Sequence, residues 1–411
     1  MAITIQREPQ RFTPAFNPVV YVADSTNNAQ PNFFYLFDIY VNNSVSFIAR
    51  LSVPAHPVHG TAMADIQREV AAYVKYSVPA IAGAFTAHGE SIAEVYVEVG
   101  ERYDVAGVST DFPALNTSAT SYVYNAAIKP SEFLNYTHTN YLPQISAAKF
   151  LSDTPMISTV SDQQFGWLYF LNDSASPVDR ARFAEIKTYN ASGALIATFR
   201  LINNFSTVST YDDRLQSVSF APGSLNNIPP SEVVVGAQPI ITAQVAKYTI
   251  QLMRTDLQYS SELRTFVINR NCNPFGQAEI YWLNRFGGIN SYTFKARVDV
   301  PVTVEGQVYE RNISRLESTG YVFNPSFPGQ VQYSTMIQER LVVNTGYLWE
   351  NESAWIADLI KSPYIYILDS DGVVPLVCNT RSITPATRLK NGKCMYTFEF
   401  NRYSPYTAQR Q

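Results

Sequence analysis

The chain is poor in charged residues, and this scarcity limits what it can bind. Charged residues make up 16% of its 411 positions, against about 25% in an ordinary soluble domain. The formal net charge is −4, and the sequence has neither a basic run nor an acidic tail. Sequence-independent binding to nucleic acid needs clustered lysine and arginine. We therefore expect no specific nucleic-acid partner.

Cysteines and long apolar runs are also scarce. The three cysteines, Cys272, Cys378 and Cys394, lie far apart without a CxxC spacing. This pattern argues against a disulfide framework and against a zinc site. The sequence has no apolar run of roughly 18 residues and no signal-peptide core in its first 20 residues. We expect buried free thiols in a soluble protein that is made in a cytoplasm and has no membrane partner.

Aromatic residues, in contrast, are abundant along the whole chain. The sequence has 27 Tyr and 24 Phe, and hydrophobic residues make up 46% of it. Aromatic residues are enriched, and Lys and Glu depleted, where one protein covers another. The composition therefore favours a surface that takes part in an assembly. A β-rich fold that prefers Tyr, Thr and Val explains the same composition without an interface.

The densest pattern is AEIYWLNRFGGINSYTF at residues 278–294. Branched and aromatic residues alternate on both sides of Gly287-Gly288, which predicts strand, turn and strand. The two glycines and Asn290 can supply the positive φ angles of a tight reversal. We expect Trp282 to face Phe294 in a sheet core. The pattern contains no nucleophile, phosphate cradle or metal ligand set, so its role is architectural.

Similar patterns along the chain predict a mainly β fold, made of several antiparallel β-sandwich-like domains with a few short helices. At roughly 100 to 200 residues per domain, the length allows two to four of them. We divide the chain into an amino-terminal β-sandwich domain with one short helix (1–145), a middle antiparallel β domain (146–265) and a carboxy-terminal β domain with a short helix at 351–361 (266–411).

Individual elements follow from the same patterns. The expected strands cover residues 3–6, 33–41, 45–53, 94–99, 122–125, 166–171, 182–189, 194–201, 208–220, 233–237, 246–253, 298–304, 307–313, 339–345, 364–368, 373–378 and 395–400. Turns are expected at Asn42-Asn43, 191–193, 369–372 and 391–392. Residues 64–76 have apolar side chains at helical spacing and predict the one amphipathic helix of the first domain. Asn351 is expected to cap the carboxy-terminal helix.

Metal sites have weak candidates in this sequence. His56 and His59 are close in sequence, but a metal needs a further ligand, and only His88 and His138 remain among the histidines. Asp369-Ser370-Asp371-Gly372 resembles the start of a calcium loop but lacks its later ligands. A loop and a hairpin turn explain these two segments better, so we expect no metal.

Catalytic candidates are equally weak. Asp212-Asp213 can form half of a glycosidase pair, yet 34 acidic residues allow many such pairs. Cys272 has only Arg270 near it to lower its pKa. The nucleophile, nucleotide-binding and zinc-protease motifs GxSxG, GxGxxG, GxxxxGK[ST] and HExxH are missing. We expect no catalytic residue and no cofactor.

Three groups of segments together carry a resemblance. They are residues 34–41 with 48–51, 65–68 and 73–74; residues 281–288 with 291–294; and residues 355–363 with 364–367. These segments resemble virion structural, tail-associated proteins of tailed phages of Bacteroidetes hosts, crAss-like phages among them. The resemblance covers the first hundred residues and most of 266–400, and it carries no catalytic residues with it. The carboxy-terminal plan is also similar to tail-tip proteins that form rings.

The resemblance implies a structural subunit of a phage virion tail, at the tail tip or baseplate or in an adaptor ring. Its expected partners are copies of itself in a symmetric ring and other tail proteins, such as tube, hub or fibres. We expect it in the virion, after assembly in the cytoplasm of the host bacterium. Ring contacts of this kind are heterologous and can add strands at sheet edges. Such edges make an isolated subunit prone to oligomerise or aggregate.

Two other functions remain open. A carbohydrate-binding or depolymerising module of a tail fibre or spike needs exposed aromatic residues with acidic neighbours, for which Tyr136, Tyr141 and Trp167 are candidates. A repeated β-helix pattern would support it, and the sequence has none. A secreted bacterial adhesin needs an export signal, which the first residues do not supply.

Overall fold

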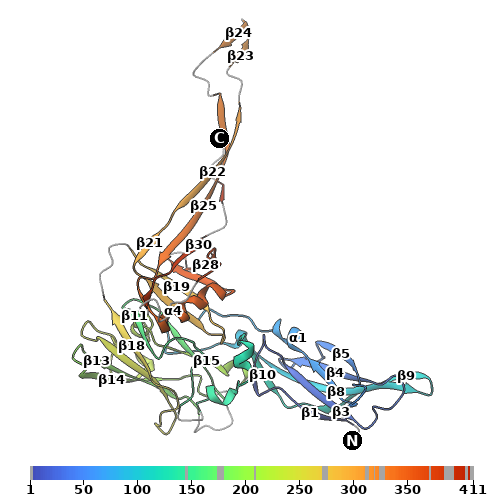
Figure 1. Ribbon diagram of the computed structural model, residues 1–411. Helices are drawn as coiled ribbons and strands as arrows, with labels where there is room; N and C mark the ends of the chain where they lie inside the picture. The colour runs from blue at the N-terminus through green and yellow to red at the C-terminus, as the bar shows by residue number, and fades with distance from the viewer. Residues whose placement is uncertain are drawn as a thin grey trace. The chain divides into compact units, whose positions relative to one another are not determined.

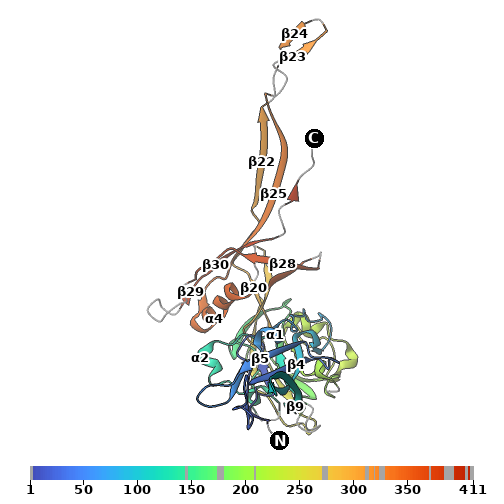
Figure 2. The same ribbon diagram turned by 90° about the vertical axis from the view of Figure 1, so that its right-hand side faces the viewer.

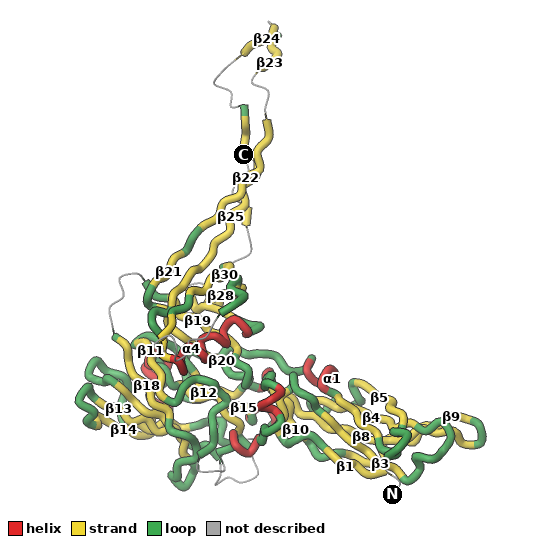
Figure 3. The backbone as a smooth tube through the Cα atoms, in the orientation of Figure 1, coloured by secondary structure: helices red, strands yellow, loops and turns green. Residues whose placement is uncertain are grey.

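Strands dominate the structure, and its helices are few and short (Figure 1; Figure 3). The computed structural model describes residues 3–143, 147–173, 180–207, 210–270, 276–310, 314–318, 320–323, 329–369, 372–383, 393–402 and 406–407. The sheets are antiparallel or mixed, with parallel pairs only at two sheet edges among the described strands. The predicted mainly β fold with a few short helices is confirmed.

The chain folds into two compact units. The first contains Met1–Arg270 and Leu283–Ser291, and the second contains Asn271–Trp282 and Tyr292–Gln411. The division into three domains at residues 145 and 265 stays a prediction. One short strand of the amino-terminal region, β7 (Phe85–Ala87), pairs with a strand of the middle region, at Leu215–Ser219.

The amino-terminal part of the first unit consists of two sheets. The strands are β1 Ile3–Arg7, β2 Phe12–Pro14, β3 Val20–Ser25, β4 Phe34–Val41, β5 Ala49–Pro54, β6 Ala62–Asp65, β8 Ile92–Val105, β9 Val108–Thr117 and β10 Ser121–Tyr124. One sheet has the order β1-β3-β6, and the other has the order β2-β10-β8-β4-β5 with β9 paired to β8. Inward-facing apolar residues of both sheets form one core.

Strand β4 shows how alternation places this core. Tyr35, Phe37 and Ile39 are fully buried within it, together with Val41. Successive side chains of a strand point to opposite faces, so Asp38 and Tyr40 lie on the other face of the sheet. The strand and its inward face were predicted from the sequence and are confirmed.

Two local predictions in this region are wrong. Asn42 and Asn43 do have positive φ angles, of 53° and 54°. The return strand, however, begins at Ala49 and not at Val45, because Ile39 pairs with Ala49 and leaves Val45 fully exposed in a longer connection. The predicted helix at 64–76 is reduced to α1 (Gln67–Ala71), since residues 62–65 pair with β3 instead.

The rest of the first unit is a second pair of sheets. Its strands are β11 Ile157–Ser161, β12 Trp167–Leu171, β13 Phe183–Tyr189, β14 Leu195–Ile202, β15 Leu215–Ser219, β16 Val233–Val235, β17 Lys247–Met253 and β18 Arg264–Asn269. A six-stranded sheet has the order β11-β18-β17-β13-β14-β16, and a three-stranded sheet has the order β12-β15-β7. Both sheets contribute to one apolar core. The buried strand at 166–171 and the hairpin turn at 191–193 are confirmed.

Short helices connect the strands of the first unit. They are η1 Gly89–Ser91, α2 Pro130–Phe133, η2 His138–Tyr141, η4 Tyr211–Asp213, α3 Pro222–Asn226 and η5 Pro230–Glu232. The predicted strand at 208–220 is therefore shorter, because residues 211–213 form η4 and the strand begins at Leu215. Residues 208 and 209 lie outside the described part of the chain.

The second unit is built on one large sheet. Its strands are β19 Ala278–Leu283, β20 Ile289–Phe294, β21 Arg297–Asp299, β22 Val302–Glu310, β25 Gln330–Asn344, β27 Ile365–Asp369, β28 Gly372–Cys378, β30 Thr397–Asn401 and β31 Tyr406–Thr407. The order is β20-β19-β27-β28-β30-β25-β21, and β22 and β31 also pair with β25. Two small pairs are β23 (Ser314–Glu317) with β24 (Gly320–Phe323), and β26 (Leu348–Trp349) with β29 (Lys393–Cys394).

Trp282 and Phe294 are fully buried in the same core of the second unit, as the sequence predicts. Helix α4 (Glu350–Ile356) packs into this core and continues as η6 (Ala357–Lys361). The helix at 351–361 is thus confirmed, but its cap is not. The N-cap is Trp349, whose backbone N–H donates to the Glu352 carboxylate at 3.4 Å, and Asn351 lies inside the helix.

Other predictions also fall partly or wholly outside the described residues, among them the strand at 307–313, of which residues 311–313 are not described. The others are the turn at 369–372, of which residues 370 and 371 are not described, the turn at 391–392, and Cys272. Across the described residues, helices are too short or too polar to cross a membrane.

The turn between β19 and β20 packs into the first unit and depends on one glycine. Gly287 has a φ of 85°, whereas Gly288 and Asn290, which were also predicted to have positive φ angles, do not. A Cβ at Gly287 would overlap the backbone carbonyl of Asn125. Asn284 holds the turn by accepting from the backbone N–H groups of Phe286 at 2.8 Å and Gly288 at 3.1 Å.

We predict that Gly287→Ala destabilises the first unit far more than Gly193→Ala. Both glycines have nearly the same φ, but nothing lies within 4 Å of a Cβ at Gly193. The control therefore measures the left-handed backbone alone, about 1–2 kcal/mol. The carbonyl of Asn125 should add about 2 kcal/mol or more at Gly287, comparable to an overpacked core. Urea denaturation of both variants measures this difference, and equal losses would contradict the packing of the turn.

Candidate functional site

One exposed element of the second unit is a ribbon of two long strands, which we call the β-arm (Figure 2). It consists of β22 and the part of β25 that pairs with it, residues 330–339, and the short strand β31 pairs with Met336 and Ile337 on the other edge of β25. Further along β25, Leu341 and Val343 belong to the core of the unit. The β-arm itself contains no fully buried residue among its described positions. A single β-hairpin is marginally stable in water, so this ribbon is an unusual structure to leave uncovered.

Apolar side chains are exposed on both faces of the β-arm. Val302, Val304 and Val308 have exposed fractions of 55%, 57% and 53%. They alternate along β22 and therefore lie on one face. Tyr309 and Tyr333 lie close together, with their rings 5.9 Å apart, and Tyr333 donates to Gln307 at 2.6 Å. Each face of the β-arm thus exposes apolar or aromatic side chains.

The first unit contains a second candidate, a polar cavity of about 380 Å³. Its lining comes from four stretches of chain: residues 128–141, 149–153, 262–264 and 285–286. Arg285 donates to both carboxylate oxygens of Glu132 at 2.6 Å. Arg264 donates to Glu262 at 2.8 Å, and the backbone N–H of Lys149 donates to the carbonyl of Asn140 at 2.7 Å. These contacts tie the stretches to one another.

The aromatic residues expected on an exposed platform lie elsewhere. Trp167 is buried in β12, and Tyr136 is buried with its hydroxyl 3.0 Å from the carbonyl of Phe12. Tyr141 is half-buried, and burial raises the pKa of its hydroxyl. Trp167 and Tyr136 therefore cannot form an exposed platform, because their rings are needed for packing. Tyr136 and Tyr141 nevertheless both line the polar cavity, with ring centres 5.9 Å apart.

The histidines are not arranged as a metal site. His56 and His59 stack with ring centres 4.9 Å apart, but His56 Nδ1 accepts from the backbone N–H groups of Val58 and His59 at 3.2 and 3.3 Å. Within the described ranges, no cluster of three or more His, Cys, Asp or Glu side chains is placed to hold a metal ion. The pair therefore shapes a loop, as predicted from its sequence.

His88 is the most strongly perturbed histidine. It is buried between Ser77 and Ser217, whose hydroxyls lie 2.9 and 2.8 Å from its ring nitrogens, and it stacks on Tyr169. Burial lowers the pKa of His88 from 6.5 to about 3. The ring is therefore neutral in the folded protein at ordinary pH, and it links the two parts of the first unit.

The remaining sequence candidates are scattered. Asp212 and Asp213 lie in η4, and burial raises the pKa of the neighbouring Tyr211. Cys378 and Cys394 were predicted to be buried, but both are only half-buried. Burial raises the pKa of the Cys378 thiol, which disfavours the reactive thiolate.

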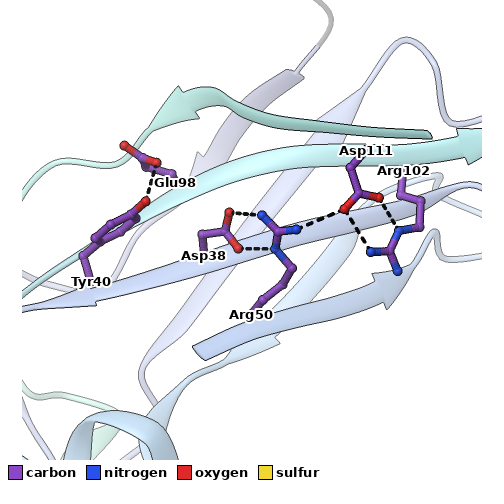
Figure 4. A network of polar contacts seen from close by, with 6 residues as sticks. All are labelled: Asp38, Tyr40, Arg50, Glu98, Arg102 and Asp111. Carbon is purple, nitrogen blue, oxygen red and sulfur yellow. Dashed lines mark hydrogen bonds and ion pairs between the residues drawn. The ribbon is translucent and has the colours of Figure 1, made fainter. Parts of the chain in front are cut away.

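A charged network covers the outer face of the β4–β5–β8–β9 sheet (Figure 4). Asp38 is buried and pairs directly across the sheet with Arg50, at 2.5 and 2.7 Å. Arg50 also reaches Asp111 at 3.0 Å, and Arg102 holds Asp111 from the other side at 2.5 Å. The hydrogen bond to Asp38 raises the pKa of Arg50, and the hydrogen bond from Arg102 lowers the pKa of Asp111. The sequence analysis missed this network.

The geometry of this network is that of a stabilising cross-strand pair, not of a catalytic dyad. Asp38 accepts two hydrogen bonds from Arg50, and Asp111 is held between Arg50 and Arg102. Beside them, Tyr40 donates to Glu98 at 2.9 Å and stacks on Tyr96, with ring centres 4.7 Å apart. The arrangement fixes the register of four strands.

We predict that Arg50→Ala costs about 3 kcal/mol of unfolding free energy, because it leaves the buried Asp38 carboxylate without its partner. Asp38 has a side-chain exposure of 4%, whereas Asp111 has 34%. Arg102→Ala, the control, should therefore cost less than about 1 kcal/mol. Chemical denaturation of the two variants distinguishes them. Similar losses for both would show that the burial of Asp38 is energetically unimportant.

We predict that His88 makes the stability fall as the pH is lowered through its unfolded pKa. Between pH 6.5 and about 3, the unfolded chain binds a proton that the folded chain excludes. The free energy of unfolding is therefore not reduced by His88 above the unfolded pKa. Below that pKa it falls by about 1.4 kcal/mol per pH unit. In His88→Gln this dependence is lost. Urea titrations of both proteins at a series of pH values measure it, and parallel curves would contradict it.

No protein-family model and no curated protein matches this chain. The β-arm and the polar cavity are therefore the features from which its function has to be inferred.

Proposed function

We propose that the chain is a structural subunit of a phage virion tail, at the tail tip or baseplate or in an adaptor ring, which acts by protein–protein assembly. The β-arm is the observation that carries this proposal. The resemblance of residues 34–41, 281–294 and 355–367 to tail-associated virion proteins supports it independently.

The β-arm is better suited to an assembly than to a free protein. Nine residue pairs hold the ribbon together, but it has no core of its own. Covering a valine completely is worth about 1.5–3 kcal/mol, and Val302, Val304 and Val308 are all more than half exposed. A neighbouring subunit that packs on this face would stabilise the ribbon. The cost in conformational entropy would be small, because the two strands are already paired.

Strand edges give the contact a second component. β22 pairs on one side with β25, and among the described strands nothing pairs with its other side. An unpaired edge can accept a further strand from another chain. When the contact runs from the β-arm of one copy to a different surface of the next, it closes into a ring if the rotation allows. The proposed partners are thus further copies of the chain and other tail proteins, within a virion assembled in a bacterial cytoplasm.

One observation favours a second function. Two of the three aromatic candidates for a carbohydrate-binding or depolymerising module of a tail fibre or spike, Tyr136 and Tyr141, line the polar cavity. This cavity is compatible with a structural role for the whole chain, since virion subunits can carry binding sites.

We predict that replacing Val302, Val304 and Val308 together by Thr weakens self-association. Threonine keeps the size and the strand preference of valine but adds a hydroxyl that resists burial. The matched control replaces Val45, Val58 and Val108, which are exposed valines of the first unit. Analytical ultracentrifugation over a range of concentrations should show larger species for the natural chain and the control, and mainly monomer for the β-arm variant.

The opposite result is equally clear. If the β-arm variant and the control associate to the same extent as the natural chain, the β-arm does not carry the contact. A shortened chain, in which an Asn-Gly turn joins Val302 to Glu339, tests the same point without the ribbon.

A further inference from the structure

We infer that the polar cavity of the first unit binds a neutral, polyhydroxylated ligand of the saccharide class. The inference does not depend on the proposed role in a tail. It follows from the shape of the cavity, the charges around it and the polar groups in its lining that have no partner in the described structure.

The cavity is an open hollow whose lining stretches are tied together by ion pairs and hydrogen bonds. Its volume of about 380 Å³ lies within the roughly 300–1,000 Å³ of small-ligand sites. The ion pair between Arg285 and Glu132 connects the hairpin turn at 285–286 with α2. Arg264 is fixed by Glu262, which also accepts from the backbone N–H of Phe150 at 3.2 Å. The walls are therefore positioned before any ligand arrives.

Several polar groups of the lining are left over. Asn135, Asn140 and Lys149 are exposed residues whose side chains make no hydrogen bond or ion pair to any described residue, and the hydroxyl of the half-buried Tyr141 makes none either. Together they offer both donors and acceptors, since an amide and a phenol do both and an ammonium donates three times. In the free protein they bond to water, which a ligand hydroxyl can replace without loss of hydrogen bonds.

The charges of the cavity favour a neutral ligand. Three carboxylates, of Glu132, Asp153 and Glu262, face three cations, of Lys149, Arg264 and Arg285. The formal charges cancel, and two of the cations are already paired with carboxylates. An anionic or cationic ligand would lose hydration without gaining a net attraction.

Aromatic rings supply the remaining feature. Tyr141 stacks on Tyr136 with ring centres 5.9 Å apart, and the ring of Phe286 lies tilted 6.1 Å from it. The face of an aromatic ring packs well on apolar C–H groups while its polar edge stays hydrogen-bonded. A sugar ring combines such a C–H face with hydroxyls that both donate and accept. Neutral charge, mixed hydrogen bonding and an aromatic wall thus point to the same ligand chemistry.

The test is a titration of the full chain with a panel of saccharides. Binding is measured by calorimetry and by saturation-transfer NMR. The panel contains glucose, galactose, mannose, N-acetylglucosamine and their disaccharides, with glucosamine and sialic acid as charged counterparts. We expect at least one neutral member to bind, at concentrations below about 10 mM. Tyr141→Ala and Lys149→Ala should each weaken that binding by about tenfold or more. Tyr73→Ala, at an exposed tyrosine of the same unit outside the cavity, should leave it unchanged.

The inference is overturned if no neutral saccharide binds, if only the charged sugars bind, or if both cavity variants bind like the natural chain. Lys149 is exposed and its side chain makes no hydrogen bond or ion pair with a described residue, so Lys149→Ala remains informative even if Tyr141→Ala fails to fold. The readout is independent of self-association, because the valine variants of the β-arm leave the cavity untouched. Failure here would therefore not affect the assembly proposal.

Discussion

The turn between β19 and β20 leaves no room for a side chain at Gly287, because a Cβ there would overlap the backbone carbonyl of Asn125 in the same unit. In the first unit, residues 283–291 are held by buried polar contacts: Asn290 donates to Asp153 at 2.6 Å, and Gln164 donates to the backbone and side chain of Ser291 at 3.1 and 3.0 Å. Just before and after this turn, Trp282 and Phe294 anchor the core of the second unit. One short hairpin thus contributes to both units. Arg285 in its turn also forms a wall of the polar cavity.

The sequence predicted best those strands and turns that depend on the pattern of neighbouring residues. Strict alternation predicted β4, the segment at 166–171 predicted β12, and the residues around Trp282 predicted a hairpin whose aromatic residues share a core. The helix at 64–76 failed because residues 62–65 pair with β3, and this long-range pairing outweighs helical spacing. The predicted start of the return strand after Asn43 was wrong because Ile39 pairs with Ala49. The connection between the two strands is therefore longer than a two-residue turn.

The candidate sites were less accessible to sequence reasoning. The cavity combines four stretches between residues 128 and 286, and nothing in a single sequence brings Tyr141, Lys149 and Arg285 together. The alternating valines of β22 could have indicated an uncovered strand, since valine and glutamate share that segment without a hydrophobic partner face. The charged network was hidden for a similar reason: Asp38 and Arg50 meet only because of the register between β4 and β5.

The central claim is that this chain works as a subunit of a symmetric assembly. The most direct test is the mass of the purified protein by light scattering, together with negative-stain imaging of the same sample. The account predicts a closed ring, or a mass that climbs toward one as the concentration rises, and the images would then give the symmetry. A monodisperse monomer at high concentration, with no rings in the images, would contradict it.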